Sequence, residues 1–375
     1  MLLMLLSACG PAANNNGEET SENATTAEKV TGEPTDDGVT TDEPTATEVA
    51  TTEAATTEEE FTTELSTTQT ISTTEEASTD APSEDLPPVK KDMKILMIGN
   101  SFCYYFVEEL YAIAAADGYD LTVANLYYSG CSVQRHYVNG ILNGEAIYEF
   151  YVTNKDGRTT IASSSNKTTF DDALAYDDWD VISIQQHFYP DLALSAQNSV
   201  NYTKTYAKNI YNHIKKENPT AELYWHQTWA YQVGYGVAEN YVSAPKVDTA
   251  IDSVAAQTTT YNNIKAASQT IAKENNVKLI PSGDAWQIAR ADSRVGDNMC
   301  ARIDINGNKG DYYHDGDIGG GQYLNACVWY EVLTRESCVG NTWRPTYTLS
   351  EEKIAGIQAA AHAAVAAVYG ENYAK

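Results

Sequence analysis

From residue 94 onward, short apolar segments alternate with longer segments of helical periodicity, and this alternation limits the fold more than any other feature of the chain. Strands that alternate with helices in this way form a parallel sheet with helices on both faces. We therefore predict an α/β fold, a three-layer α/β/α sandwich around a five-stranded parallel sheet. The expected strands span 94–98, 121–126, 180–185, 221–226 and 277–281, with a hairpin at 146–162. The expected helices span 107–117, 195–217, 247–275, 321–335 and 350–368.

The first 90 residues differ in composition from the rest of the chain. They contain 20 Asp and Glu, two Lys, 21 Thr and a single aromatic residue, Phe61, and they carry −18 of the net charge of −28. So little apolar surface cannot offset the conformational entropy of ordering the segment. We expect residues 10–92 to be a disordered acidic linker and residues 93–375 to be one folded domain. Because an acidic chain repels phosphates, we expect no binding to nucleic acid.

The amino terminus has the outline of a secretion signal. An apolar run, Met1–Leu6, precedes Ser7, Ala8 and Cys9, and the string Leu6–Cys9 resembles the processing site of bacterial lipoproteins. The resemblance implies a signal peptide over residues 1–9 and acylation of Cys9. The run lacks a preceding Lys or Arg, so a chance Cys after an apolar start is the alternative. We expect a protein on the extracellular face of the cell membrane, held by lipid alone, since no run approaches the roughly 20 apolar residues of a membrane span.

Polar residues follow the expected strands at their carboxyl ends, which is where parallel sheets bind ligands. Each of these strings alone could be a turn or a helix cap, but together they predict a functional cleft. They are Gly99-Asn100-Ser101, Ser129-Gly130-Cys131, Gln185-Gln186-His187, His226-Gln227-Thr228-Trp229 and Ser282-Gly283-Asp284.

Among these and the neighbouring residues, Ser101 and His314 are the candidate catalytic residues. Ser101 at a strand-to-helix turn is either a helix N-cap or a nucleophile that an adjacent base activates. Among the six His, His314 is distinctive because Asp311 precedes it by three residues, and a carboxylate can orient an imidazole. A polar loop is the alternative explanation of that pair. Trp229 is the best candidate for stacking on a sugar.

Three strings, in this order along the chain, resemble motifs of the SGNH (GDSL-like) hydrolase superfamily. They are Gly99-Asn100-Ser101-Phe102 for block I, with Asn in place of the usual Asp, Ser129-Gly130-Cys131-Ser132 for block II, and Asp311-Tyr312-Tyr313-His314 for block V. Further strings, such as Thr228-Trp229-Ala230-Tyr231, are similar to a bacterial branch described as domains of unknown function. The resemblance implies a flavodoxin-like domain, catalytic Ser101, His314 and Asp311, and no metal or cofactor.

Block III departs from the superfamily pattern Gly-x-Asn-Asp. The chain has Ile184-Gln185-Gln186-His187 at this place. A Gln amide can donate the same hydrogen bond as the missing Asn. We favour Gln186 over Gln185 as the third oxyanion donor, beside the backbone N–H groups of Ser101 and Gly130. We expect Asn100, His187, His226 and Trp229 to bind substrate.

These observations predict a surface-anchored serine esterase that removes acyl groups, acetyl in particular, from carbohydrates through an acyl-enzyme. The alternative is a catalytically weak relative that binds glycans, which the unusual block III favours. We expect a monomer whose substrate is an acylated carbohydrate or another small ester. Setting Cys9 aside leaves an odd number of cysteines; Cys300 with Cys338 is a candidate disulfide, and buried free thiols are the alternative that we favour.

Overall fold

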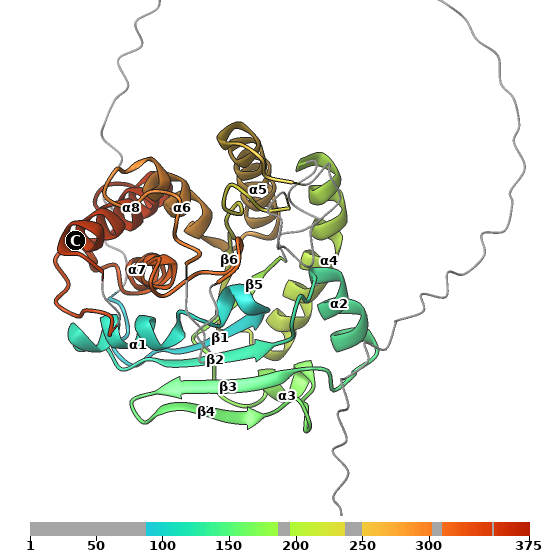
Figure 1. The fold of residues 1–375 in the computed structure, drawn as a ribbon. Helices are drawn as coiled ribbons and strands as arrows, with labels where there is room; N and C mark the ends of the chain where they lie inside the picture. Colours follow the sequence, from blue (N-terminus) through green and yellow to red (C-terminus); the bar gives the residue numbers. More distant parts are fainter. Residues whose placement is uncertain (1–87, 187–195, 237–249, 302–309, 347–348) are drawn as a thin grey trace, which may run out of the picture. The chain divides into compact units, whose positions relative to one another are not determined.

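The computed structural model describes residues 88–186, 196–236, 250–301, 310–346 and 349–375, with the backbone alone for 196–202. Within these segments the chain forms a seven-stranded sheet in the order β4-β3-β2-β1-β5-β6-β7 (Figure 1). The strands are β1 (Lys94–Gly99), β2 (Thr122–Tyr127), β3 (Glu149–Asn154), β4 (Gly157–Ala162), β5 (Val181–Gln185), β6 (Glu222–His226) and β7 (Lys278–Ile280).

Five of these strands run parallel, in the order β2-β1-β5-β6-β7, and this confirms the predicted parallel sheet. The order is that of flavodoxin-like folds, with the reversal of winding beside the central strand β1. The register sets Gly99 beside Tyr127 and Gln185 beside His226. The carboxyl ends of these strands therefore meet at one edge of the sheet, as the polar strings predict.

The predicted hairpin forms, and it enlarges the sheet. Strand β3 pairs antiparallel with β2, and β4 pairs antiparallel with β3. At the turn, the Asn154 side chain accepts the Asp156 N–H at 2.9 Å, and Gly157 has a φ of 93°, which favours glycine. The addition of the hairpin to the edge of the parallel sheet was not predicted, because a hairpin's own pattern does not show which strand it will pair with.

Helices cover both faces of the sheet (Figure 1). On one face α1, α6, α7 and α8 pack on one another, and on the other face α4 packs against both α2 and α5. Helix α7 is buried along nearly all of its length, beneath its neighbours, which suits its apolar sequence. The helices are α1 (Val107–Ala116), α2 (Val133–Arg135), α3 (Phe170–Leu174), α4 (Ala196–Glu217), α5 (Val254–Asn275), α6 (Ser282–Ala291), α7 (Gly321–Thr334) and α8 (Glu351–Tyr369), and a π-helix, η2, spans His136–Leu142.

The cysteines of the described segments are all buried free thiols. The candidate disulfide between Cys300 and Cys338 was therefore wrong, and the alternative of free thiols is confirmed for these two residues. Cys9 and the expected signal and linker segments lie outside the described residues. No helix in the described part of the chain has the length and apolar character needed to cross a membrane.

Candidate active site

Ser101 lies at the carboxyl end of the central strand β1 and begins a short 3₁₀ helix, η1 (Ser101–Cys103). Asn100, not Ser101, caps this helix: its side-chain oxygen accepts the Phe102 N–H at 3.0 Å. The alternative role that we weighed for Ser101, helix capping, is thus filled by its neighbour. The Ser101 hydroxyl is not used in capping, and the residue stays 8% exposed.

His314 joins Ser101 to Asp311. Its Nε2 atom lies 2.8 Å from Ser101 Oγ, and its Nδ1 atom hydrogen-bonds to Asp311 Oδ2. Asp311 Oδ1 in turn accepts the backbone N–H groups of Tyr313, at 3.0 Å, and of His314, at 2.7 Å. The structure therefore brings together the three residues that the sequence singled out for catalysis, from the start of η1 and from the loop before α7.

The environment of Asp311 keeps it ionised. Burial alone would raise the pKa of Asp311, but the hydrogen bonds from the His314 ring and from two backbone N–H groups outweigh it and hold the pKa below its ordinary value. An ionised carboxylate only accepts hydrogen bonds, so Nδ1 of His314 carries the proton. Nε2 is then the acceptor for the Ser101 hydroxyl.

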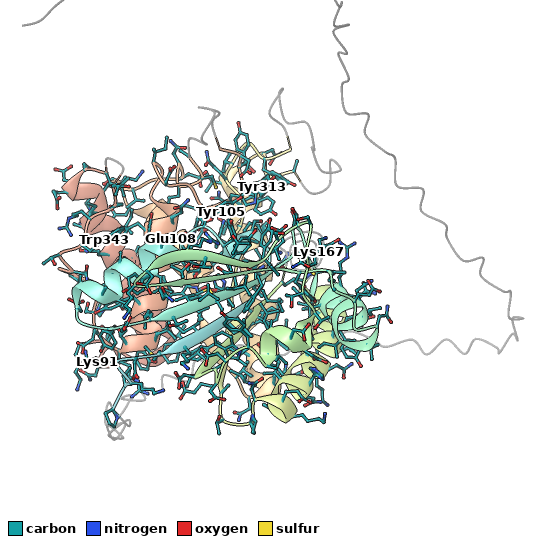
Figure 2. All side chains as sticks on the ribbon, turned by 90° about the horizontal axis from the view of Figure 1, so that it is seen from below. Lys91, Tyr105, Glu108, Lys167, Tyr313 and Trp343 are labelled. Atoms are coloured by element: carbon teal, nitrogen blue, oxygen red, sulfur yellow. The ribbon has the colours of Figure 1, made fainter. Side chains whose placement is uncertain are left out.

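Aromatic rings enclose the imidazole of His314. The ring centroids of Tyr105 and Tyr313 lie 5.3 Å and 4.2 Å from that of His314, and both tyrosines are half-buried (labelled in Figure 2). Phe102 lies 5.9 Å away. These contacts limit the movement of the imidazole and keep water from part of its surface.

The turn after β2 is bonded to the end of β1, just before Ser101. Gly130 adopts a φ of 61°, in the left-handed region that favours glycine. Two hydrogen bonds tie this turn to the end of β1, from the Tyr128 N–H to the Gly99 carbonyl and from the Asn100 side chain to the Cys131 carbonyl, both at 3.1 Å. In the described segments no acceptor meets the backbone N–H of Ser101 or of Gly130. Two donors are therefore available at this edge of the sheet.

Gln185 does not face the site, and its predicted role as an oxyanion donor was wrong. Its amide nitrogen donates to Asn100 Oδ1 at 2.6 Å. The orientation of Asn100 is certain, because its oxygen accepts a backbone N–H and its nitrogen donates to a backbone carbonyl. Gln185 also packs on Gly99, where a Cβ would lie 2.7 Å from Gln185 Cγ. The amide of Gln185 therefore joins two strand ends inside the core.

Of the two glutamines, Gln186 is the one whose side chain is hydrogen-bonded next to the Gly130 turn. Its side-chain oxygen accepts the N–H of Val133 at 2.9 Å, just after the turn that contains Gly130. Because a backbone N–H only donates, the oxygen is fixed on that side, and the NH₂ group is the donor end of the amide. Gln186 is buried, and its amide is anchored beside the block II turn.

Three residues predicted to bind substrate are buried and make internal contacts. Asn100 is 0% exposed and His226 and Trp229 are each 1% exposed. His226 hydrogen-bonds to Ser282 Oγ at 3.0 Å, and burial lowers its pKa to about 3. The Trp229 ring stacks on Trp286 with centroids 4.5 Å apart. The prediction was wrong for these three residues: α6 covers His226 and Trp229, and Asn100 is held among the ends of β1, β2 and β5.

His187, predicted to bind substrate, lies outside the described residues. Tyr105 and Val133 were missed, although Tyr105 follows Ser101 by one helical turn and Val133 begins the helix after the Gly130 turn. In the described part of the chain, no group of three or more His, Cys, Asp or Glu side chains is arranged to hold a metal ion.

The chain resembles several known proteins. A DUF4886 family protein from Bacteroides uniformis, known from its crystal structure, is 32% identical; the match covers 75% of this chain and 96% of that chain, with a TM-score of 0.60. An acetyl xylan esterase is 15% identical, with 64% of this chain and 100% of that chain covered and a TM-score of 0.35. A GDSL-like lipase from Bacteroides thetaiotaomicron is 12% identical, with 66% of this chain and 90% of that chain covered and a TM-score of 0.32.

No curated protein matches the chain. Because residues 94–364 match the domain of unknown function DUF4886, and a solved member of that family aligns over most of the folded part, the chain belongs to the DUF4886 family.

Proposed function

We propose that the protein is a serine esterase that removes acyl groups, acetyl in particular, from carbohydrates at the cell surface. The observation that carries the proposal is the 2.8 Å approach of His314 Nε2 to Ser101 Oγ, with Asp311 on the other ring nitrogen. A hydroxyl, an imidazole and a carboxylate in this order make the nucleophile, base and orienting group of acyl transfer. This geometry supports an enzyme over a module that only binds glycans.

The reaction proceeds in two acyl-transfer steps. Ser101 Oγ attacks the ester carbonyl carbon while His314 Nε2 takes the hydroxyl proton, and Asp311 stabilises the imidazolium that forms. The tetrahedral intermediate collapses as His314 gives that proton to the departing sugar oxygen, which leaves an acyl group on Ser101. Water then attacks the acyl-enzyme with His314 again as base, which releases the carboxylic acid and restores the serine.

The oxyanion requires hydrogen-bond donors near Ser101. We assign the backbone N–H groups of Ser101 and Gly130 to this role, because both lie at the edge of the sheet that holds the nucleophile and neither meets an acceptor in the described segments. We assign the third donor to the NH₂ group of Gln186, whose oxygen is anchored on Val133. Each such donor is worth about 10²- to 10³-fold in rate.

We propose the substrate class from the expected location of the protein at the cell surface and from the residues that surround the site. Half-buried tyrosines beside His314 present an apolar ring with a polar tip, which suits a sugar better than a bare hydrocarbon chain. A lipid on Cys9 would hold the protein at the cell surface. A flexible linker of about 80 residues would span roughly 50 Å and let the domain reach polymeric substrates.

Acetate release from acetylated xylan and from p-nitrophenyl acetate by the full-length protein tests this function. We expect turnover by the unaltered protein and by Ser163→Ala, which removes a hydroxyl in the β4–α3 loop outside the site. Ser101→Ala should lose turnover by at least 10³-fold. Equal release by Ser101→Ala would refute the serine mechanism. Glycan binding that survives Ser101→Ala, with no turnover of either ester by the unaltered protein, would establish the binding module instead.

A further inference from the structure

The buried indole of Trp229 is hydrogen-bonded to the backbone beside His314. Its Nε1–H donates to the carbonyl oxygen of Tyr313 at 2.9 Å. One face of the ring is stacked on Trp286, with the two planes 2° apart, and the ring of Phe102 meets it at 66° with centroids 5.0 Å apart. Trp229 therefore contacts the residue before the base and the residue after the nucleophile.

A second series of hydrogen bonds reaches the residue after His314. Trp286 in α6 donates its indole N–H to Asn325 Oδ1 at 2.8 Å, and Asn325 in α7 donates its Nδ2–H to Asp315 Oδ2 at 3.1 Å. Trp286, Asn325 and Asp315 are all 0% exposed. An indole only donates and a carboxylate only accepts, so the amide of Asn325 has one orientation in this series. Both neighbours of His314 in the chain are thus held by buried side chains.

We propose that Trp229 is a positioning residue for His314, and that Trp286 and Asn325 support it from behind; this proposal rests on the function assigned to the Ser101–His314 pair. Backbone dihedrals at residue 314 set where its imidazole points. A bond on the carbonyl of residue 313 and a bond on the side chain of residue 315 fix these dihedrals from both sides. The imidazole then meets the Ser101 hydroxyl and Asp311 together, without reorganisation during the reaction.

The size of the effect follows from how strictly proton transfer depends on geometry. A displacement of the base by about 1 Å costs about 10²-fold in rate, although the residue that caused it never touches the substrate. Loss of the Trp229 hydrogen bond leaves the Tyr313 carbonyl without this buried donor and lets the loop shift. We therefore expect a fall in kcat of about 10- to 100-fold with KM little changed, because Trp229 is buried and does not contact substrate.

Trp229→Phe and Trp225→Phe form a matched pair that separates positioning from packing. Both residues are buried tryptophans, at 1% and 0% exposure, and both substitutions remove the same ring volume. The indole nitrogen of Trp225 has no hydrogen-bond partner among the described residues, whereas that of Trp229 donates to Tyr313. We expect similar losses in thermal stability from the two variants. Only Trp229→Phe should lower kcat on p-nitrophenyl acetate, and an equal kcat in the two variants would overturn the proposal.

The tautomer of His314 can be measured without any turnover of ester. The nitrogen-15 chemical shifts of His314, assigned by comparison with His314→Gln, report which ring nitrogen carries the proton. We expect the Nδ1–H tautomer in the unaltered protein and in Trp225→Phe, and a mixture of tautomers in Trp229→Phe. If no ester is turned over but Trp229→Phe alone changes the tautomer, the esterase function fails and the positioning stands. An unchanged tautomer in Trp229→Phe would refute the positioning whether or not the protein hydrolyses esters.

Discussion

Asn100→Asp tests the way in which Asn100 joins three strand ends beneath the nucleophile. The amide nitrogen of Asn100 donates to the Cys131 carbonyl at 3.1 Å, while its oxygen accepts from Phe102 and Gln185. The substitution keeps the size and the accepting oxygen. It replaces the donor by a carboxylate oxygen that faces a carbonyl oxygen in the core. The superfamily that the block I string resembles usually has Asp here, so the outcome cannot be assumed from that resemblance.

The expected loss in the free energy of unfolding follows from these contacts. Asn100 is 0% exposed, so a buried carbonyl that loses its donor costs about 1–3 kcal/mol, and the facing negative oxygen adds to this. The Phe102 N–H and the Gln185 amide offset part of the cost of the buried charge. We expect Asn100→Asp to reduce the free energy of unfolding by about 2–4 kcal/mol at pH 8, a large part of the roughly 5–15 kcal/mol of a typical domain.

The introduced carboxyl makes this deficit in the free energy of unfolding depend on pH. When protonated, the introduced carboxyl can donate to the Cys131 carbonyl, so the folded state favours the protonated form and raises its pKa above the unfolded value of about 4. Between these two pKa values the folded state binds more protons than the unfolded state, and stability falls as pH rises. The deficit relative to the unaltered protein should therefore shrink from pH 8 to pH 4.5.

Urea unfolding at both pH values measures this deficit. Asn166→Asp, at an exposed position whose side chain makes no hydrogen bond in the described structure, adds the same charge and serves as the control; we expect it to match the unaltered protein within about 0.5 kcal/mol. If Asn100→Asp is as stable as that control at pH 8, or if its deficit is unchanged at pH 4.5, the role assigned to Asn100 is wrong.

Three further predictions concern the site and the core. Gln186→Glu removes the proposed oxyanion donor and should lower kcat on p-nitrophenyl acetate by at least about 10²-fold, whereas an unchanged kcat would exclude Gln186 from the oxyanion hole. Asp311→Asn should leave the fold intact by circular dichroism and lower kcat by about 10³- to 10⁴-fold, because the imidazole loses the acceptor that selects its tautomer; a loss under tenfold would contradict that role. Burial lowers the pKa of both His136 and His226 to about 3, so the unfolded state binds more protons between about pH 3 and 6.5, and stability should fall as pH drops through this window. Urea unfolding should show a shallower slope in His226→Gln, by up to about 1.4 kcal/mol per pH unit, and an equal slope would show that His226 titrates normally.

The parallel sheet and the three residues of the Ser101 site could be predicted because each leaves a local mark. A buried strand is a short apolar run, and the end of such a run in a parallel sheet is where polar side chains gather. Asp311 and His314 are close in sequence, so their pairing needs only one loop. Their approach to Ser101 is a long-range contact, and it was predicted from the resemblance rather than from the spacing.

The wrong predictions concern residues whose surroundings come from distant parts of the chain. Trp229 and His226 follow a strand end, as a ligand-binding residue would, but α6 supplies Trp286 and Ser282 to cover them. The sequence shows that an aromatic residue is present, not which face of it is covered. Gln185 and Gln186 are adjacent and identical in type, so only their different partners, Asn100 and Val133, distinguish them.

Covalent labelling of the full-length protein by a fluorophosphonate tests directly whether Ser101 is an activated nucleophile, because this reagent reacts preferentially with a serine that a neighbouring base activates. Peptide mass spectrometry would then locate the adduct. We expect one adduct per chain on Ser101, and none in Ser101→Ala or in His314→Gln. A folded protein that takes up no label, or that carries the label on another residue, would contradict the assignment of Ser101 as the nucleophile and His314 as its base.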